Sequence, residues 1–151
     1  MNTATTTHIT PLTNQQLFDN ALFGIRRQNY ATSGKEDNGF TYLYRGPNGT
    51  KCGIGHSIPD ELYCSEMEET CVGSLIAGPD YHDSLAVLFS GVDSELASRV
   101  QDAHDSGVNM RTSTVKMDPG SFEARMEAVA SRFGLTYTQG LPDLAPTGVP
   151  A

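Results

Sequence analysis

The chain has 151 residues, which suits one globular domain, and its hydrophobic fraction of 38% is modest but sufficient for one core. Its formal net charge is −8, and its ten lysines and arginines are scattered along the chain. This pattern argues against a generic nucleic-acid or anionic-membrane surface, because phosphate contacts need clustered cations. No apolar run approaches the ~20 residues that cross a bilayer, so we expect no membrane contact.

Three cysteines are an odd number, and the first eight residues have neither a basic start nor an apolar run. We therefore expect no secretory signal and reduced thiols in a cytoplasm. Residues 1–12 are rich in threonine, which predicts a flexible N-terminal segment.

A helix is predicted from about Asn14 to Asn29. Thr13 and Gln16 have the spacing of a capping box at its start. One apolar stripe follows at helical intervals, formed by Leu17, Phe18, Ala21, Leu22 and Ile25. The polar stretch 31–39 is then expected to form a loop.

The next stretch has the pattern of a β-hairpin. Phe40–Arg45 is rich in aromatic and branched residues, the letters GPNG at 46–49 suit a tight turn, and Thr50–Gly55 runs back. Alternation along the return strand would put Cys52, Ile54 and His56 on an inward face, with Lys51, Gly53 and Gly55 opposite. The glycines on that second face predict a close approach of other backbone or of a ligand. The preceding helix is expected to pack on the inward face.

Two helix starts are predicted after the hairpin. Pro59 with the acids that follow it suits a first helical turn. Ser65 and Glu68 have capping-box spacing, and Met67, Cys71 and Leu75 would then share one side.

The letters YRGPNGTKCGIGHSIPDELY, followed by MEET and VGSL, resemble a set of small phage and prophage proteins. Those proteins share the pattern YRGPxGxKCxIGxxIPDExYxxxME and have no established activity. The resemblance is tight over residues 42–68 and loose over 14–135. Cys52, Gly53 and Gly55 fall in its KCxIG element, whereas Cys64 and Cys71 fall outside it. It implies a phage or mobile-element origin, and thus the cytoplasm of a host cell, but little chemistry.

Three further segments follow. Residues 80–90 are apolar after Ser84 and suit either a helix or a buried strand, and we favour a helix. Asp93 or Ser94 is expected to cap a helix that ends near Asp105. Asp118 before a proline starts the last predicted helix, which Gly134 ends.

The predicted fold is a single small α+β domain over residues 13–135. A short antiparallel hairpin or three-stranded sheet would be covered by four or five helices. From residue 136 to 151 the chain is dominated by proline and glycine, which predicts a disordered tail.

Thiols and imidazoles suggest two kinds of site. Cys52, His56, Cys64 and Cys71 could ligate zinc, although their spacing matches no familiar zinc motif and buried cysteines often only fill space. Cys52 could instead act as a nucleophile with a histidine base, but a strand position facing the core does not lower a thiol pKa. We therefore expect neither zinc nor catalysis.

Histidine–aspartate pairs occur at His82–Asp83 and at His104–Asp105. With His56 and Asp102 they supply the ligand types of a divalent-metal phosphohydrolase. A histidine at the C-terminal end of a helix also suits the helix dipole, which explains the second pair without a metal.

The turn of the predicted hairpin combines backbone N–H groups with two cations. Arg45, Asn48, Gly49 and Lys51 could therefore bind a phosphate or carboxylate, although an ordinary turn with charged neighbours has the same residues.

We expect a non-catalytic, phage-encoded accessory protein that binds a host or defence-system protein or a small nucleotide-like signal molecule. One alternative is a small hydrolase or transferase that uses Cys52 with His56 or His104 and Asp105. Another is a structural or assembly component of a phage. A homo-oligomer sharing the pocket at the turn would suit capture of a small molecule.

Overall fold

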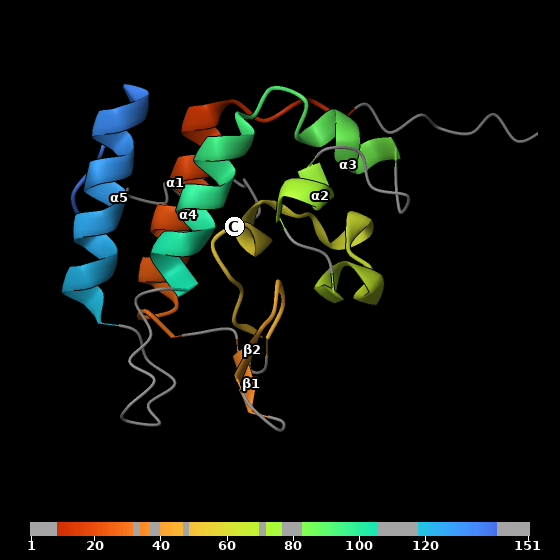
Figure 1. The fold of residues 1–151 in the computed structure, drawn as a ribbon, viewed down its shortest axis with the longest axis horizontal. Helices are drawn as coiled ribbons and strands as arrows, with labels where there is room; N and C mark the ends of the chain where they lie inside the picture. The colour runs from red at the N-terminus through yellow and green to blue at the C-terminus, as the bar shows by residue number, and fades with distance from the viewer. Residues whose placement is uncertain are drawn as a thin grey trace, which may run out of the picture.

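A computed structural model describes residues 9–31, 34–36, 40–46, 49–69, 72–76, 83–105 and 118–141. Most of its regular structure is helical (Figure 1). The helices are α1 (Asn14–Arg27), α2 (Val72–Ile76), α3 (Asp83–Leu88), α4 (Ser94–Asp105) and α5 (Pro119–Phe133), with the 3-10 helices η2 (Gly55–Ser57), η3 (Asp60–Leu62) and η4 (Ser65–Glu69). The strands are β1 (Gly34–Glu36) and β2 (Phe40–Tyr42).

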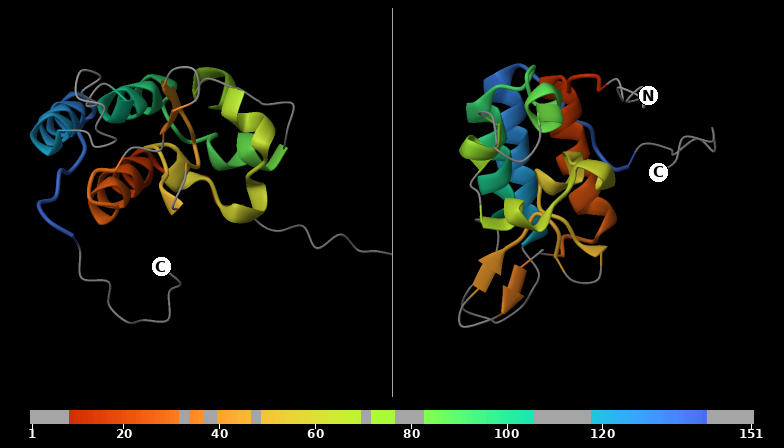
Figure 2. Two further views of the ribbon diagram at one scale, coloured as in Figure 1. Left: turned by 90° about the horizontal axis from the view of Figure 1, so that it is seen from below. Right: turned by 90° about the vertical axis from the view of Figure 1, so that its right-hand side faces the viewer.

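The three longest helices, α1, α4 and α5, lie side by side, and α5 runs antiparallel to α4 (Figures 1 and 2). The short helices α2 and α3 lie on the side of α1 and α4 that is away from α5 (Figure 1). The β1–β2 ladder projects from the lower end of the molecule in this view. The largest fully buried side chains come from the five α-helices and the segments that connect them: Phe18, Phe89, Phe122, Leu17, Leu22, Ile25, Ile54, Met67, Leu75, Leu85 and Leu96.

The predicted start of α1 is confirmed. Thr13 Oγ1 accepts a hydrogen bond from the backbone N–H of Gln16, and Gln16 Oε1 accepts one from the N–H of Thr13, both at 3.0 Å. The two bonds satisfy N–H groups that the first helical turn leaves without a carbonyl partner. All five residues of the predicted apolar stripe are buried.

The predicted caps of α4 and α5 are also confirmed. Asp93 Oδ1 accepts hydrogen bonds from the N–H groups of Glu95 and Leu96, at 2.8 and 3.2 Å. Asp118 Oδ2 accepts one from Ser121 at 3.2 Å. Gly134 ends α5 with a φ of 66°, a left-handed conformation that glycine adopts without steric cost.

The α+β prediction is wrong, because the described residues form a mainly helical fold without a helix-covered sheet. Their only strand ladder pairs Gly34–Glu36 with Phe40–Tyr42, three residues on each side. Phe40–Tyr42 therefore pairs with the preceding segment and not with Thr50–Gly55. Of the predicted hairpin there remains one bridge between Arg45 and Lys51, with a hydrogen bond from Gly46 N to Thr50 O of 2.8 Å.

The predicted return strand instead becomes a helical turn that enters the core. Ile54 has helical backbone angles, and His56 N donates to Cys52 O at 3.2 Å. Gly53 lies against Val100 of α4 and Ala21 of α1, so the segment is inserted between these helices. The predicted close approach is confirmed at Gly55, where an added Cβ would lie 2.1 Å from the carbonyl oxygen of Tyr44. Such packing overrides the alternating pattern.

The second predicted helix start also takes another form. The segment from Ser65 is a 3-10 helix, and the Glu68 side chain bonds residues outside this helix start in place of the predicted capping bond. Glu68 Oε1 accepts from the N–H of Tyr44 at 2.6 Å, while Glu68 Oε2 accepts from the N–H of Arg45 at 3.2 Å and from Tyr63 at 2.5 Å. Glu68 therefore ties the η4 segment to residues 44 and 45.

Between residues 80 and 90 the expected helix is confirmed as α3. The end of this helix also holds the chain before α1, because Leu12 N donates to Leu88 O at 2.8 Å.

A polar network joins the C-terminal segment to α1 and α5. Arg26 pairs with both oxygens of Glu123, at 2.6 and 2.8 Å, and donates to the carbonyls of Thr138 and Gly140 at 2.7 and 2.5 Å. Tyr137 donates to Glu123 at 2.5 Å. Domain boundaries at 13 and 135 stay a prediction, and residues 142–151 of the predicted tail lie outside the described part.

Candidate functional site: an arginine groove beside a closed interior

Cys52 is fully buried, with 0% of its surface exposed. Its Sγ accepts a hydrogen bond from the backbone N–H of Gly55 at 3.3 Å, inside the turn that precedes η2. A reagent or substrate therefore has no open path to the sulfur in this conformation. The packing agrees with a thiol that fills space.

His56 lies between Gly24 and Gln28 of the α1 end. An added Cβ on Gly24 would lie 2.4 Å from His56 Cγ, so the ring is pressed against the helix backbone. His56 Nε2 lies 3.0 Å from Gln28 Oε1, and the same oxygen accepts from Lys51 N at 3.1 Å. Burial and the nearby cation of Lys51 lower the pKa of His56 to about 4. The imidazole is thus neutral at pH 7, with its Nε2–H donating to Gln28.

His104 on α4 is 1% exposed. Burial lowers its pKa to about 4, and a hydrogen bond with the backbone of Ala31 opposes that shift. We call Cys52, His56, His104 and Gln28 the interior cluster. Burial holds the two imidazoles of this cluster uncharged, which suits a core more than a site for proton transfer to solvent-borne substrates.

Among the described residues, the other predicted metal ligands do not gather around His56 or His104. Cys64 is partly buried and its thiol pKa is raised, mainly by desolvation and by a hydrogen bond with Glu66. Cys71, His82 and the side chains of Asp83 and Asp105 lie outside the described residues. Within the described part of the chain, no three histidine, cysteine or acidic side chains gather in a geometry that could hold a metal ion.

Arg45 of the predicted anion-binding turn is directed inward. Its Nη2 donates to the carbonyl of Ile58 at 3.1 Å and pairs with Asp60 at 2.6 Å, and its guanidinium lies 4.4 Å from the ring centre of Tyr63. Arg45 therefore already has an anionic partner and a stacking partner. Gly49 is exposed with a φ of 74°, and Asn48 lies outside the described residues.

Lys51 and His56, from two different predicted sites, both line one shallow hollow of about 540 Å³. Asp60 and Glu61 line the same hollow, so its acids offset the charge of Lys51. This balance gives the hollow no strong preference for an anion.

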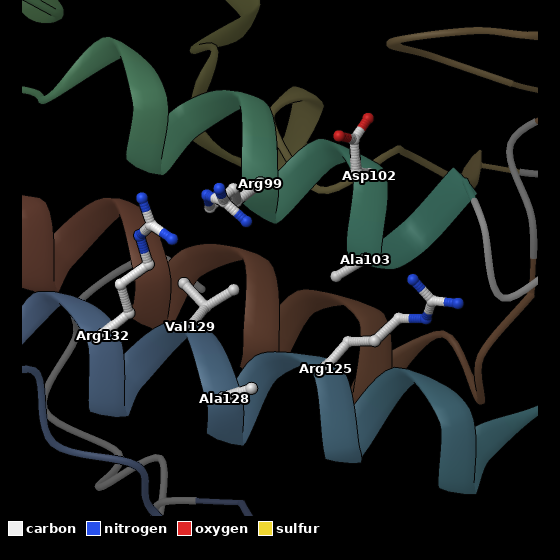
Figure 3. A pocket seen from close by; sticks show the side chains of 7 residues that line it. All are labelled: Arg99, Asp102, Ala103, Arg125, Ala128, Val129 and Arg132. Atoms are coloured by element: carbon white, nitrogen blue, oxygen red, sulfur yellow. The ribbon is translucent and has the colours of Figure 1, made fainter.

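A second hollow, between α4 and α5, has a different lining. It measures about 430 Å³ and is lined by Arg99, Asp102, Ala103, Arg125, Ala128, Val129 and Arg132, which together we call the arginine groove. Figure 3 shows Arg132 extending from α5 toward α4 and ending beside Arg99, with Arg125 farther along the groove. Alanine side chains leave room between the two helices.

Helical spacing places Arg125 and Arg132 on one face of α5, opposite Arg99 of α4. Arg125 and Arg132 are seven residues apart on α5, which is close to two turns. On α4, Leu96, Val100 and Ala103 face the core, and Arg99 lies beside that stripe. Glu95 joins the two helices, because its Oε1 accepts from Arg99 Nε at 3.1 Å and from Arg132 Nη2 at 2.6 Å.

Sequence reasoning missed this groove. The seven-residue spacing of Arg125 and Arg132 was a usable signal, since it puts both on one helix face. The contribution of Arg99 had no local signal, because it depends on α4 packing against α5. The scattered cations of the sequence are thus partly gathered in space.

No described helix combines the length and the apolar character needed to span a bilayer. Cytoplasmic localisation, like the phage origin implied by the YRGP-containing motif, stays a prediction. Comparison with protein-family models, with curated proteins and with solved structures finds no match to this chain.

Proposed function

We propose that this chain is a phage-encoded accessory protein that acts by binding, without catalysis, and that the arginine groove is its recognition site. The partner is an anionic molecule of the host cell: an acidic region of a host or defence-system protein, or a small nucleotide-like signal molecule. The observation that carries the proposal is the gathering of Arg99, Arg125 and Arg132 at one solvent-exposed hollow of an acidic protein.

Surface exposure supports a binding role for these residues. The side chains of Arg99 and Arg132 are 44% and 53% exposed, so their guanidinium groups remain accessible beside the groove. Arginine presents planar N–H donors that match the oxygens of carboxylates and phosphates. Arg26 and Arg45 also pair with acids, as Arg99 and Arg132 do with Glu95, but their side chains are only 7% and 23% exposed.

The interior cluster supports a non-catalytic role. A nucleophile and its base must reach a substrate before any argument about pKa applies. Cys52 and His104 are 0% and 1% exposed. No observation on the described residues favours the hydrolase or transferase, or a phage assembly role, over binding.

The proposal is tested by thermal-shift and titration measurements with two anionic probes, poly-glutamate and a nucleoside triphosphate. We expect at least one probe to bind the wild-type protein. Replacing Arg99 and Arg132 together by glutamate should weaken that binding by at least tenfold, because like charges then face the ligand.

Arg27→Glu is the matched control, since Arg27 is an exposed arginine at the end of α1, outside the groove. An equal loss with Arg27→Glu would overturn the assignment of the groove. Turnover of an ester or nucleotide that Cys52→Ala abolishes would overturn the non-catalytic function itself.

A further inference from the structure

Glu95 places one carboxylate oxygen between two guanidinium groups. Its Oε1 lies 3.1 Å from Arg99 Nε and 2.6 Å from Arg132 Nη2, so cations of two helices meet at one oxygen. The Glu95 side chain is 53% exposed, and an incoming anion can therefore replace it without unpacking the core. This oxygen marks where an anionic ligand atom would sit.

Each arginine keeps further donors. A guanidinium has five N–H groups, and within the described residues each of these two arginines is bonded through a single nitrogen. The remaining N–H groups can approach two more oxygens of the same ligand group. A phosphate offers three terminal oxygens and a charge near −2, whereas a carboxylate offers two oxygens and a charge of −1.

Arg125 supplies a second anchor along the groove. It precedes Arg132 by seven residues, which is about 10 Å along the axis of α5. Its Nε donates a long hydrogen bond of 3.4 Å to Ser121 Oγ. Figure 3 shows its guanidinium near Ala103, at a different point of the groove from the Arg99 and Arg132 pair.

The acids at this site limit which ligands fit. Asp102 lines the groove, but Figure 3 shows its carboxylate directed away from α5. With three arginines, Glu95 and Asp102, the local formal charge is only about +1, and the chain as a whole carries −8. A single weak anion therefore gains little here. A ligand must contact both anchors to be held well.

Building on the proposed binding function, we propose that the arginine groove takes a small molecule with two phosphate groups, spaced to reach both the Arg99–Arg132 pair and Arg125. One phosphate displaces Glu95 between Arg99 and Arg132, and the other contacts Arg125. Glu95 is then an internal competitor that occupies the first position in the free protein.

The test is isothermal titration of the full chain with fructose 1,6-bisphosphate and fructose 6-phosphate as probes, at low salt and at 150 mM salt. The two probes share a sugar and differ in the second phosphate. We expect the bisphosphate to bind at least tenfold more tightly than the monophosphate, and both to weaken as salt screens the exposed cations.

Three variants assign the two anchors. Arg125→Ala should reduce bisphosphate affinity to that of the monophosphate and leave the monophosphate unchanged. Arg132→Ala should weaken both probes by at least tenfold. Glu95→Gln should tighten both by about threefold or more, because the competing charge is gone while the side-chain shape is kept. Arg27→Ala is the control and should change neither affinity.

The outcomes separate this inference from the proposed function. If poly-glutamate binds through Arg99 and Arg132 but neither sugar phosphate does, the groove binds an acidic protein and the phosphate inference fails. If Arg27→Ala weakens both probes as strongly as Arg132→Ala, the anions bind any arginine and the inference also fails. If no anion binds at all, both proposals fall. Circular dichroism of each variant excludes unfolding as the cause.

Discussion

Helix α4 contributes to two regions of opposite character. His104 belongs to the interior cluster and is 1% exposed, whereas Arg99 lines the arginine groove and is 44% exposed. The two residues are five positions apart, about 140° around the helix axis. The comparison shows that a reactive residue type does not by itself mark a site, because burial decides whether it meets a ligand. Changes to the interior should therefore cost stability, and changes to the groove should cost binding.

The largest effect is expected for Gly55→Ala. The added methyl group would meet the carbonyl oxygen of Tyr44 at 2.1 Å, and backbone on both sides would have to move. We expect the free energy of unfolding to fall by ~3 kcal/mol or more, measured by urea denaturation. Gly120→Ala is the control, since its Cβ would have no neighbour closer than 3.9 Å and it lies in a helix. Equal costs for both changes would contradict the inserted turn.

Cysteine labelling comes next in expected size. In a Cys71→Ser background, iodoacetamide should modify Cys64 in the native protein and leave Cys52 at least about a hundredfold slower, because Cys52 reacts only after the core opens. Cys52 is 0% exposed, while Cys64 is partly buried. Mass spectrometry of peptides distinguishes the two. Rapid labelling of Cys52 in the native protein would mean that its sulfur is accessible, and would support the enzyme hypothesis.

Acid should destabilise the protein through the interior histidines. The folded-state pKa of His104 is about 4 against an ordinary 6.5, so the unfolded chain binds a proton at pH values where the folded chain does not. The stability that the neutral His104 contributes is therefore complete above pH 6.5 and is lost as the pH falls toward 4.

We expect His104→Gln to remove about 2 kcal/mol of the difference in unfolding free energy between pH 7.5 and pH 4.5. Urea denaturation at both pH values measures it. Between pH 7.5 and 8.5 the unfolding free energy of the variant should change with pH as that of the wild type does, because His104 titrates there in neither the folded nor the unfolded state. An unchanged dependence below pH 6.5 would mean that His104 is charged or exposed in the folded state.

The smallest effect is expected in the groove. Arg99→Ala and Arg132→Ala remove ion pairs between exposed side chains, and such pairs contribute between about 0 and 1 kcal/mol. We expect the free energy of unfolding to change by less than ~0.5 kcal/mol in each. Calorimetric melting of both variants checks this value. A loss of several kcal/mol would make the groove part of the structural core and weaken its assignment as a recognition site.

Local sequence signals predicted the helices. The predicted hairpin was wrong, because the structure of that segment depends on tertiary contacts. The caps at Thr13, Asp93 and Asp118 were visible because they depend on residues two or three positions apart. The return strand was wrong because Gly53 and Gly55 suit a strand that meets other backbone and also suit a turn wedged between helices. Nothing local distinguishes the two, since the choice depends on α1 and α4.

The arginine groove was missed for the same reason. Anion binding by Arg45 and Lys51 stays a prediction: Asp60 pairs with Arg45, while the bonds between Lys51 and Gln28 are made by the Lys51 backbone. Arg99 and Arg132 come together only when α4 packs on α5. A pairing of residues 33 positions apart has no short-range trace in a single sequence.

The network around Arg26 sets a practical limit on dissecting this chain. A fragment cut at Gly134, where the last helix ends, would lose the carbonyls of Thr138 and Gly140 and the hydroxyl of Tyr137. Arg26 and Glu123 would keep their ion pair but lose these hydrogen-bond partners, although the Arg26 side chain is only 7% exposed. A shortened chain should therefore keep the residues through Gly140, and a reporter fused after them should be tolerated better than one fused at the helix end.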